Sequence, residues 1–198
     1  MLRGSIVAAV FAAALLLVPG KSMAQNFVVD HYTSADQLYT FVENGATGAN
    51  EFNITSFACA NIYVYSFQDI VACGSCLVSP NGSLEEDLDA DLINHPVTGV
   101  RPPTGVVKVV FTSWNQNFCD PTALGATSAN LKAFRAKGTS ELELFDNNVL
   151  SAAEEARLNS DCTAVFTVLS GAFNVTCGPT DAPPKGYKGN NPPGYRGH

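Results

Sequence analysis

Six cysteines constrain the fold of this chain more than any other feature of its sequence. All of them lie between residues 59 and 177, beyond an apolar N-terminal segment. An even number of cysteines in an oxidising compartment is typical of a disulfide framework, whose pairing the spacing alone leaves open. The six residues are Cys59, Cys73, Cys76, Cys119, Cys162 and Cys177.

The oxidising compartment is predicted by residues 1–24, which have the three parts of a cleavable signal peptide. Arg3 forms a positive n-region, and residues 6–18 are all apolar but too few to span a bilayer. Small residues stand at the −3 and −1 positions of a cleavage site between Ala24 and Gln25. This site argues against the alternative of an uncleaved N-terminal anchor. We therefore expect a secreted protein, either extracellular or periplasmic.

The mature chain is expected to be one β-rich domain, residues 25–178, followed by a tail. Removing Arg3 and Lys21 with the leader leaves nine of the 11 basic residues against 18 acidic ones. This negative charge repels phosphate backbones and anionic membranes, so nucleic acid is not an expected partner. No second apolar run is long enough to span a membrane. Residues 179–198 are rich in glycine and proline with little to bury, which predicts disorder.

The apolar residues of the domain come in short runs, which predicts a mainly β fold. The runs are rich in valine, isoleucine, phenylalanine, tyrosine and threonine, and glycine, proline, asparagine and aspartate separate them. So many short strands favour an antiparallel two-sheet sandwich of the jelly-roll or immunoglobulin-like type. Strands are expected at 27–29, 38–42, 52–57, 61–65, 70–78, 84–92, 106–112, 131–136, 142–145, 164–169 and 173–177.

One short helix is predicted over residues 151–161. Ser151 and Glu154 have the spacing of a capping box, in which each side chain accepts a hydrogen bond from the other residue's amide. Leu158 and Cys162 stand four residues apart and so share one face of the helix. We expect this face to pack against a sheet, with Cys162 tying it there.

Cys73 and Cys76 have the C-x-x-C spacing that redox pairs and zinc sites share. A redox pair would place Cys73 at the start of a helix, whereas here it lies in a β-like run. A zinc site would require further ligands, and no second C-x-x-C or H-x-x-H pattern supplies them. Structural disulfides are therefore favoured over these two alternatives.

A predicted hairpin suggests a partner for one of these cysteines. If residues 66–69 form a four-residue loop, Tyr65 faces Ile70 across the two flanking strands. Counting outward from this pair places Cys59 opposite Cys76. The favoured disulfide is therefore Cys59–Cys76.

An acidic run provides the one candidate metal site. In residues 84–92 the even positions are apolar except Glu86, and the odd positions between them are acidic, so a strand places four carboxylates on one face. Asp87, Asp89 and Asp91 match the first ligands of an EF-hand loop, but the glycine and glutamate that complete such a loop are missing. A shared Ca²⁺, a basic partner and a solvated acidic face remain the alternatives.

The cysteine neighbourhoods carry a resemblance to known sequences. The pattern resembles a group of uncharacterised secreted bacterial proteins, cysteine-containing and β-rich, to which no activity is assigned. This resemblance implies export and disulfides, and transfers no site residue. It also argues against eukaryotic glycosylation at Asn174 and two other N-x-[ST] patterns. The matching segments are 59–65, 73–76, 79–82, 96–100, 119–121, 150–154, Cys162 and Cys177.

No catalytic or cofactor motif stands out in the sequence. His31 and His95 lack a nearby nucleophile signature such as G-x-S-x-G, so we assign neither a catalytic role nor a cofactor. The leading hypothesis is a non-enzymatic extracellular module, a surface component or a binding domain for a protein or polysaccharide. One alternative is a secreted polysaccharide hydrolase with acids from residues 85–91 or from Glu141 and Glu143. The other is a Ca²⁺-stabilised adhesin.

Overall fold

A computed structural model describes most of the predicted domain. The described residues are 27–33, 37–43, 57–67, 69–79, 82–114, 119–128, 131–137, 141–144 and 147–177. The predicted signal peptide, its cleavage site at Ala24 and the tail at 179–198 lie outside these residues, as does most of the strand expected at 52–57.

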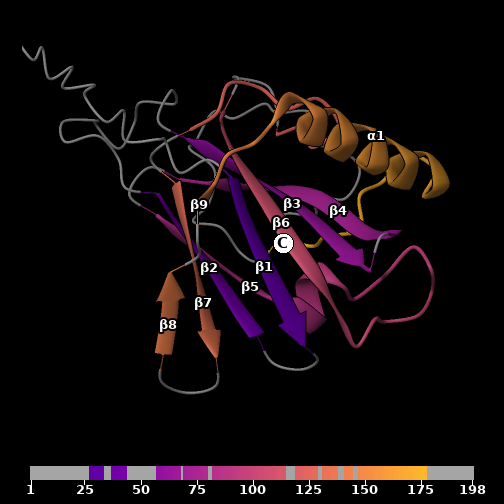
Figure 1. The fold of residues 1–198 in the computed structure, drawn as a ribbon, viewed down its shortest axis with the longest axis horizontal. Coiled ribbons are helices and arrows are strands. Elements are labelled where there is room, and N and C mark those ends of the chain that lie inside the picture. Colours follow the sequence, from indigo (N-terminus) through magenta and orange to yellow (C-terminus); the bar gives the residue numbers. More distant parts are fainter. Residues whose placement is uncertain are drawn as a thin grey trace, which may run out of the picture.

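The described part of the chain is mainly β, as predicted (Figure 1). All paired strands are antiparallel, and they form two sheets with the strand orders β4-β3-β6-β1-β9 and β5-β2-β7-β8. The strands are β1 (Phe27–Thr33), β2 (Gln37–Glu43), β3 (Ala58–Ser66), β4 (Asp69–Val78), β5 (Ser83–Asp87), β6 (Thr104–Ser113), β7 (Leu131–Lys137), β8 (Glu141–Leu144) and β9 (Asn147–Asn148).

The two sheets pack against each other around one apolar core. Strand β3 directs alternate side chains, among them Ala60 and Ile62, into this core, because successive residues of a strand face opposite ways. From the second sheet, Phe41 meets Phe111 of β6 edge to face, with ring centroids 6.3 Å apart. The assignment to a jelly-roll or immunoglobulin-like type stays a prediction.

Helix α1 (Ala152–Val168) covers the outer face of the first sheet along β4 (Figure 1). Its start was predicted correctly, since the Ser151 side chain accepts a hydrogen bond from the Glu154 amide at 3.1 Å. Leu158 and Cys162 are buried against the sheet, as expected. The expected strand at 164–169 is wrong, because Val165 continues this buried face and packing overrides its β propensity.

The disulfide pairing differs from the one favoured by the sequence. Each bridge joins segments far apart in the chain, with sequence separations of 60, 89 and 101 residues. The bridges are Cys59–Cys119, Cys73–Cys162 and Cys76–Cys177.

The favoured pair Cys59–Cys76 is wrong because of a bulge in the hairpin. The loop is shorter than predicted, because Ser66 and Asp69 pair within the ladder, but Tyr65 does face Ile70. The register then shifts by one residue beyond Tyr65, so that Ala60 rather than Cys59 faces Cys76. A one-residue shift moves a side chain to the other face of a sheet. Cys76 therefore points into the core between the sheets, and Cys59 points outward.

The acidic run forms a strand only in its first half. Strand β5 ends at Asp87, and a single turn of π-helix, η2 (Leu88–Leu92), follows it. The strand expected to reach residue 92 is wrong beyond Asp87, because the Asp87 carboxylate accepts hydrogen bonds from two amides of the turn and caps it. Within β5 the expected alternation holds, since Glu86 is buried on the same face as Leu84. Ala90 of the turn is exposed, whereas the expected strand would have buried it.

Candidate functional site

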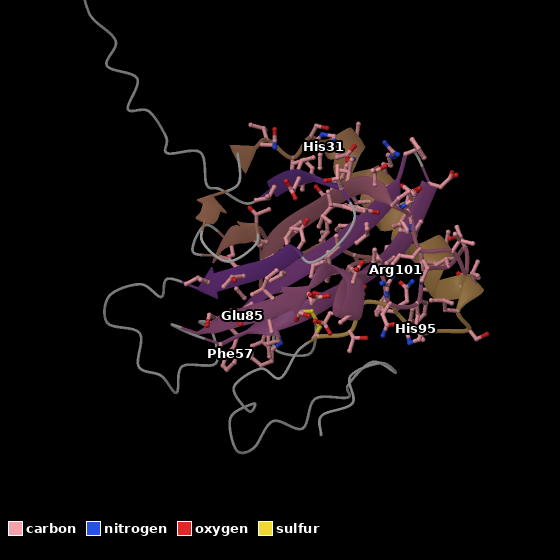
Figure 2. The ribbon with its side chains drawn as sticks, turned by 90° about the horizontal axis from the view of Figure 1, so that it is seen from below. His31, Phe57, Glu85, His95 and Arg101 are labelled. Atoms are coloured by element: carbon pink, nitrogen blue, oxygen red, sulfur yellow. A yellow bond between two sulfur atoms is a disulfide. The ribbon has the colours of Figure 1, made fainter. Side chains whose placement is uncertain are left out.

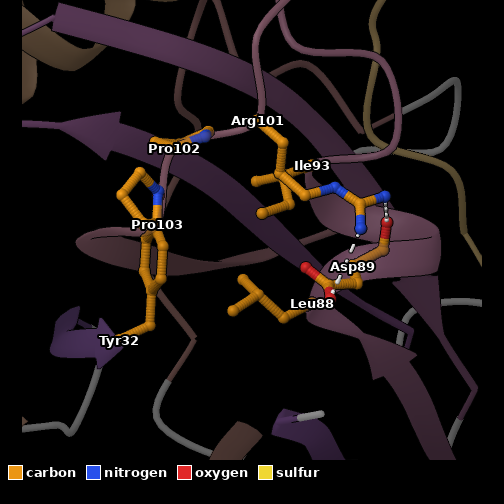
Figure 3. Close-up of a pocket in the computed structure, with 7 residues that line it drawn as sticks. All are labelled: Tyr32, Leu88, Asp89, Ile93, Arg101, Pro102 and Pro103. Atoms are coloured by element: carbon orange, nitrogen blue, oxygen red, sulfur yellow. Dashed lines mark hydrogen bonds and ion pairs between the residues drawn. The ribbon is translucent and has the colours of Figure 1, made fainter. Parts of the chain in front are cut away.

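A pocket of about 140 Å³ opens where β1 ends and β6 begins (Figure 3). Strand β1 contributes a tyrosine to the lining, and the segment before β6 contributes an arginine and two prolines. The remaining lining residues come from η2 and from the residue that follows it. The lining residues are Tyr32, Leu88, Asp89, Ile93, Arg101, Pro102 and Pro103.

The hydroxyl of Tyr32 lies close to the Tyr65 carbonyl and to the backbone of Gly105. It lies opposite Gly105 in the β1–β6 ladder, and its hydroxyl donates a hydrogen bond to the Tyr65 carbonyl at 3.4 Å. A Cβ atom on Gly105 would lie 2.0 Å from the Tyr65 carbonyl oxygen and 2.5 Å from the Tyr32 hydroxyl. Position 105 therefore requires a glycine for this wall of the pocket to form.

The phenol of Tyr32 stays neutral over the physiological pH range. Burial raises the pKa of Tyr32 to about 12, and the negative charge of Asp89 adds to this shift. The hydroxyl is therefore a hydrogen-bond donor at this end of the molecule and not a charged group.

The mouth of the pocket carries an ion pair (Figure 3). Arg101 donates a hydrogen bond to the Asp89 carbonyl at 2.8 Å, and its other terminal nitrogen lies 3.4 Å from the Asp89 carboxylate. The two side chains are 47% and 28% exposed, so the pair contributes at most about 1 kcal/mol to stability. Its main effect is to present a guanidinium group beside an apolar hollow.

Of the three predicted calcium ligands, Asp89 lines the pocket and Asp87 and Asp91 do not, and each has a contact of its own. Asp87 caps the turn, Asp91 accepts a hydrogen bond from the Asp87 amide at 2.8 Å, and Asp89 pairs with Arg101. Among the described residues, another group of three potential metal ligands has its ligand atoms close together, and it contains none of these aspartates. That set is Cys76, Glu86 and Cys177, in which the two sulfurs are joined in a disulfide. The calcium site stays a prediction.

Of the acids proposed for hydrolysis, Asp89 lines the pocket. Glu85 is exposed on β5, whereas its neighbour Glu86 is fully buried on the other face of the strand. For Glu141 and Glu143 the structure describes the backbone of β8 but not the side chains. In the view of Figure 2, Glu85 lies to the left of Arg101 and apart from it.

The two histidines of the domain are exposed and lie apart. His31 stands on β1, and His95 follows η2, near Arg101 in the view of Figure 2. Neither lines the pocket.

A buried asparagine fixes the segment that leads to the pocket. The Asn174 side chain accepts a hydrogen bond from the Cys73 amide at 3.0 Å and donates to the carbonyls of Val71 and His95 at 2.9 and 2.6 Å. Sequence reasoning missed this role, because Asn174 showed only an N-x-[ST] pattern. Its buried, hydrogen-bonded amide nitrogen is not accessible to a glycosylating enzyme in the folded chain.

A second polar cluster fastens α1 to the sheet. The Tyr65 hydroxyl donates to the Asp161 carboxylate at 2.8 Å, and Arg157 pairs with Asp161 at 3.4 Å. Lys108 of β6 forms an ion pair with Glu154 of the helix. Burial, and then the bond to Asp161, raise the pKa of Tyr65 well above its usual value. These contacts join two elements, so we assign them a structural role.

Comparisons with protein-family models, with curated proteins and with solved structures find no match to this chain. The resemblance to secreted bacterial proteins therefore stays a prediction. Within the described residues, no helix has the length and apolar character needed to cross a membrane.

Proposed function

We propose that this chain is an exported, non-enzymatic binding module that acts in the extracellular or periplasmic space. Its partner is an extracellular protein or a polysaccharide, and the pocket beside Arg101 receives one side chain or sugar ring of that partner. The observation that carries the proposal is the pairing of all six cysteines in three disulfides.

The disulfides support export because of where they lie. One ties α1 to the sheet, one ties the segment after Trp114 to β3, and one ties the C-terminal end of the described chain to β4. In reducing compartments such cysteines stay as free thiols, whereas secreted domains commonly form disulfides that stabilise the packing of their layers. This architecture supports the predicted signal peptide at residues 1–24.

The chemistry of the pocket supports binding. Its walls are mostly apolar, with two rigid prolines and a single ion pair at the mouth. The residues that line it include no serine, cysteine or histidine, and their carboxylate, Asp89, is paired with Arg101. We also infer that the two packed sheets form a sandwich of the jelly-roll or immunoglobulin-like type, a fold that carries binding loops at the ends of its strands.

A titration followed by NMR tests this function. The oxidised chain from Gln25, labelled with ¹⁵N, is titrated with short peptides that carry one apolar side chain and with cello- and chito-oligosaccharides. We expect one of these probes to shift the amide signals of residues 88–93 and of Arg101. Shifts confined to another surface, or no shift at millimolar probe, would contradict the proposal.

Two arginine variants sharpen the test. Arg101→Ala should weaken the binding of the probe. Arg157→Ala is the matched control, because Arg157 is equally exposed and also pairs with an aspartate at 3.4 Å, but on the helix. Release of reducing sugar from the oligosaccharides would instead favour the hydrolase.

A further inference from the structure

Phe67 is an exposed aromatic side chain held in an unusual backbone conformation. It lies at the tip of the β3–β4 hairpin, is 85% exposed and has a φ of 56°. This left-handed region is uncommon for any residue other than glycine, and bulky residues there are strained. Backbone conformations of this kind cluster at binding and switch sites, which makes the exposed ring of Phe67 a candidate contact residue.

The Phe67 tip and the pocket lie at the same end of the molecule. Tyr65, two residues before Phe67, accepts the hydrogen bond of the pocket residue Tyr32 through its carbonyl. In Figure 2 the same end carries Arg101, while Phe57, which precedes the start of β3, lies at the other end. Val100, next to Arg101, is also exposed and adds to the apolar surface.

The pocket has the size and the lining that a phenyl ring requires. Its volume is about 140 Å³. An apolar cavity of about 150 Å³ accepts benzene. The walls made by Leu88, Ile93 and Pro103 offer the apolar contacts that a ring would bury.

The charges around the tip and the pocket are complementary. Asp69 stands two residues after Phe67 and is exposed. Arg101 stands at the mouth of the pocket, and its guanidinium keeps donors beyond those that face Asp89. A ring that enters the pocket of another molecule thus brings a carboxylate toward an arginine.

We propose that two copies of this chain form a dimer in which each Phe67 inserts into the pocket of the other. The inference rests on the proposed function in taking this pocket as a binding site, and it names a second copy as the occupant. Because tip and pocket share one end, a two-fold axis brings both contacts together in one self-complementary interface. The Asp69 carboxylate of each copy pairs with Arg101 of the other.

Analytical ultracentrifugation of the oxidised chain from Gln25 tests the dimer. We expect a monomer–dimer equilibrium that Phe67→Ala weakens by roughly 30-fold or more, as removal of a central interface residue does. Val149→Ser is the matched control, because Val149 is an exposed apolar residue beside β9, at the opposite end of β1 from Tyr32. It should leave the equilibrium unchanged.

Charge reversal provides a second test that does not depend on the aromatic ring. Asp69→Arg and Arg101→Glu should each weaken the dimer, and the double variant should recover part of the loss. Recovery requires the two residues to meet across the interface, and a merely destabilising change does not produce it.

Two outcomes overturn the dimer. One is a chain that stays monomeric up to millimolar concentration, and the other is a dimer that Phe67→Ala leaves intact. The NMR titration is repeated on Phe67→Ala, whose pocket a second copy no longer fills. If a peptide or oligosaccharide still shifts the signals of the pocket in a monomeric chain, the proposed function stands and only the dimer fails.

Discussion

Cys73 of β4 and Cys162 of α1 form a disulfide across the outer face of the first sheet, with Cα atoms 5.7 Å apart. Both residues are fully buried in an apolar cluster with Tyr63 and Leu158. The bridge therefore fixes the helix to the sheet within a packed layer.

Removing this bridge should destabilise the domain strongly. The double change Cys73→Ala with Cys162→Ala is expected to lower the free energy of unfolding by about 2–5 kcal/mol, since it frees a long loop in the unfolded chain. Denaturation by urea measures the loss. The pair Cys59 and Cys119 closes a shorter loop and should lose a similar amount, because loop entropy grows slowly with length. A loss below about 1 kcal/mol at both sites would contradict the structural role of the bridges.

Gly105 should tolerate no larger residue. Gly105→Ala places a Cβ 2.0 Å from the Tyr65 carbonyl oxygen, so the backbone of β3 or β6 has to shift. Overpacking of this kind costs about 1–3 kcal/mol, and a fall in melting temperature reports it. Gly125→Ala is the control, because a Cβ there meets nothing within 4 Å. Equal melting temperatures for the two variants would refute the close approach.

Asp87 should act through its cap. Asp87→Ala is expected to cost about 0.5–2 kcal/mol, whereas Asp87→Asn should cost much less, because an asparagine side chain also accepts amide hydrogen bonds. Thermal melts of both variants, with and without millimolar Ca²⁺, measure the effect. A calcium-dependent rise in melting temperature that Asp87→Asn and Asp89→Asn abolish would instead establish the adhesin hypothesis.

The domain should lose stability at alkaline pH. Tyr32 ionises near pH 10 in the unfolded chain but at about 12 in the folded one, so the folded state holds its proton more tightly. Its contribution is complete below pH 10 and is lost as pH rises toward 12. Urea unfolding between pH 9 and 11.5 should show a shallower fall for Tyr32→Phe than for the wild type. The slope difference is at most about 1.4 kcal/mol per pH unit. Identical slopes would exclude this role for Tyr32.

Most strands were predictable from sequence, but the pairing of the cysteines was not. The strands expected at 164–169 and 173–177 are absent, since 164–168 belongs to α1 and 173–177 has no regular secondary structure. Alternation of apolar residues located β3 and β4, and turn residues located their loop. The bulge beyond Tyr65 then moved Cys59 and Cys76 to opposite faces. Such a bulge depends on how the hairpin packs on the rest of the sheet, and no local sequence pattern predicted it.

Helix α1 shows the same division between local and tertiary causes. The capping box at Ser151 predicted its start, because capping is a local hydrogen-bond pattern. Its end was predicted too early, since Val165, Thr167 and Val168 have the composition of a strand. Burial of Val165 against the sheet decides their conformation.

The pocket was out of reach of sequence reasoning. Its walls come from Tyr32, from the turn after Asp87 and from Arg101 to Pro103, which only the fold brings together. The acidic run drew attention to the right neighbourhood. The alternation of acidic and apolar residues, however, predicted a strand through residue 92. That Asp87 is a favourable capping residue, which ends the strand, was overlooked.

Peptide mapping of the exported protein by mass spectrometry without reduction tests the central claim, that this is an oxidised, exported module. We expect a chain that begins at Gln25, has no free thiol and yields three linked peptide pairs. Those pairs join Cys59 with Cys119, Cys73 with Cys162, and Cys76 with Cys177. A retained N-terminal segment, two or more free thiols per chain, or a peptide pair that links Cys59 to Cys76 would contradict it.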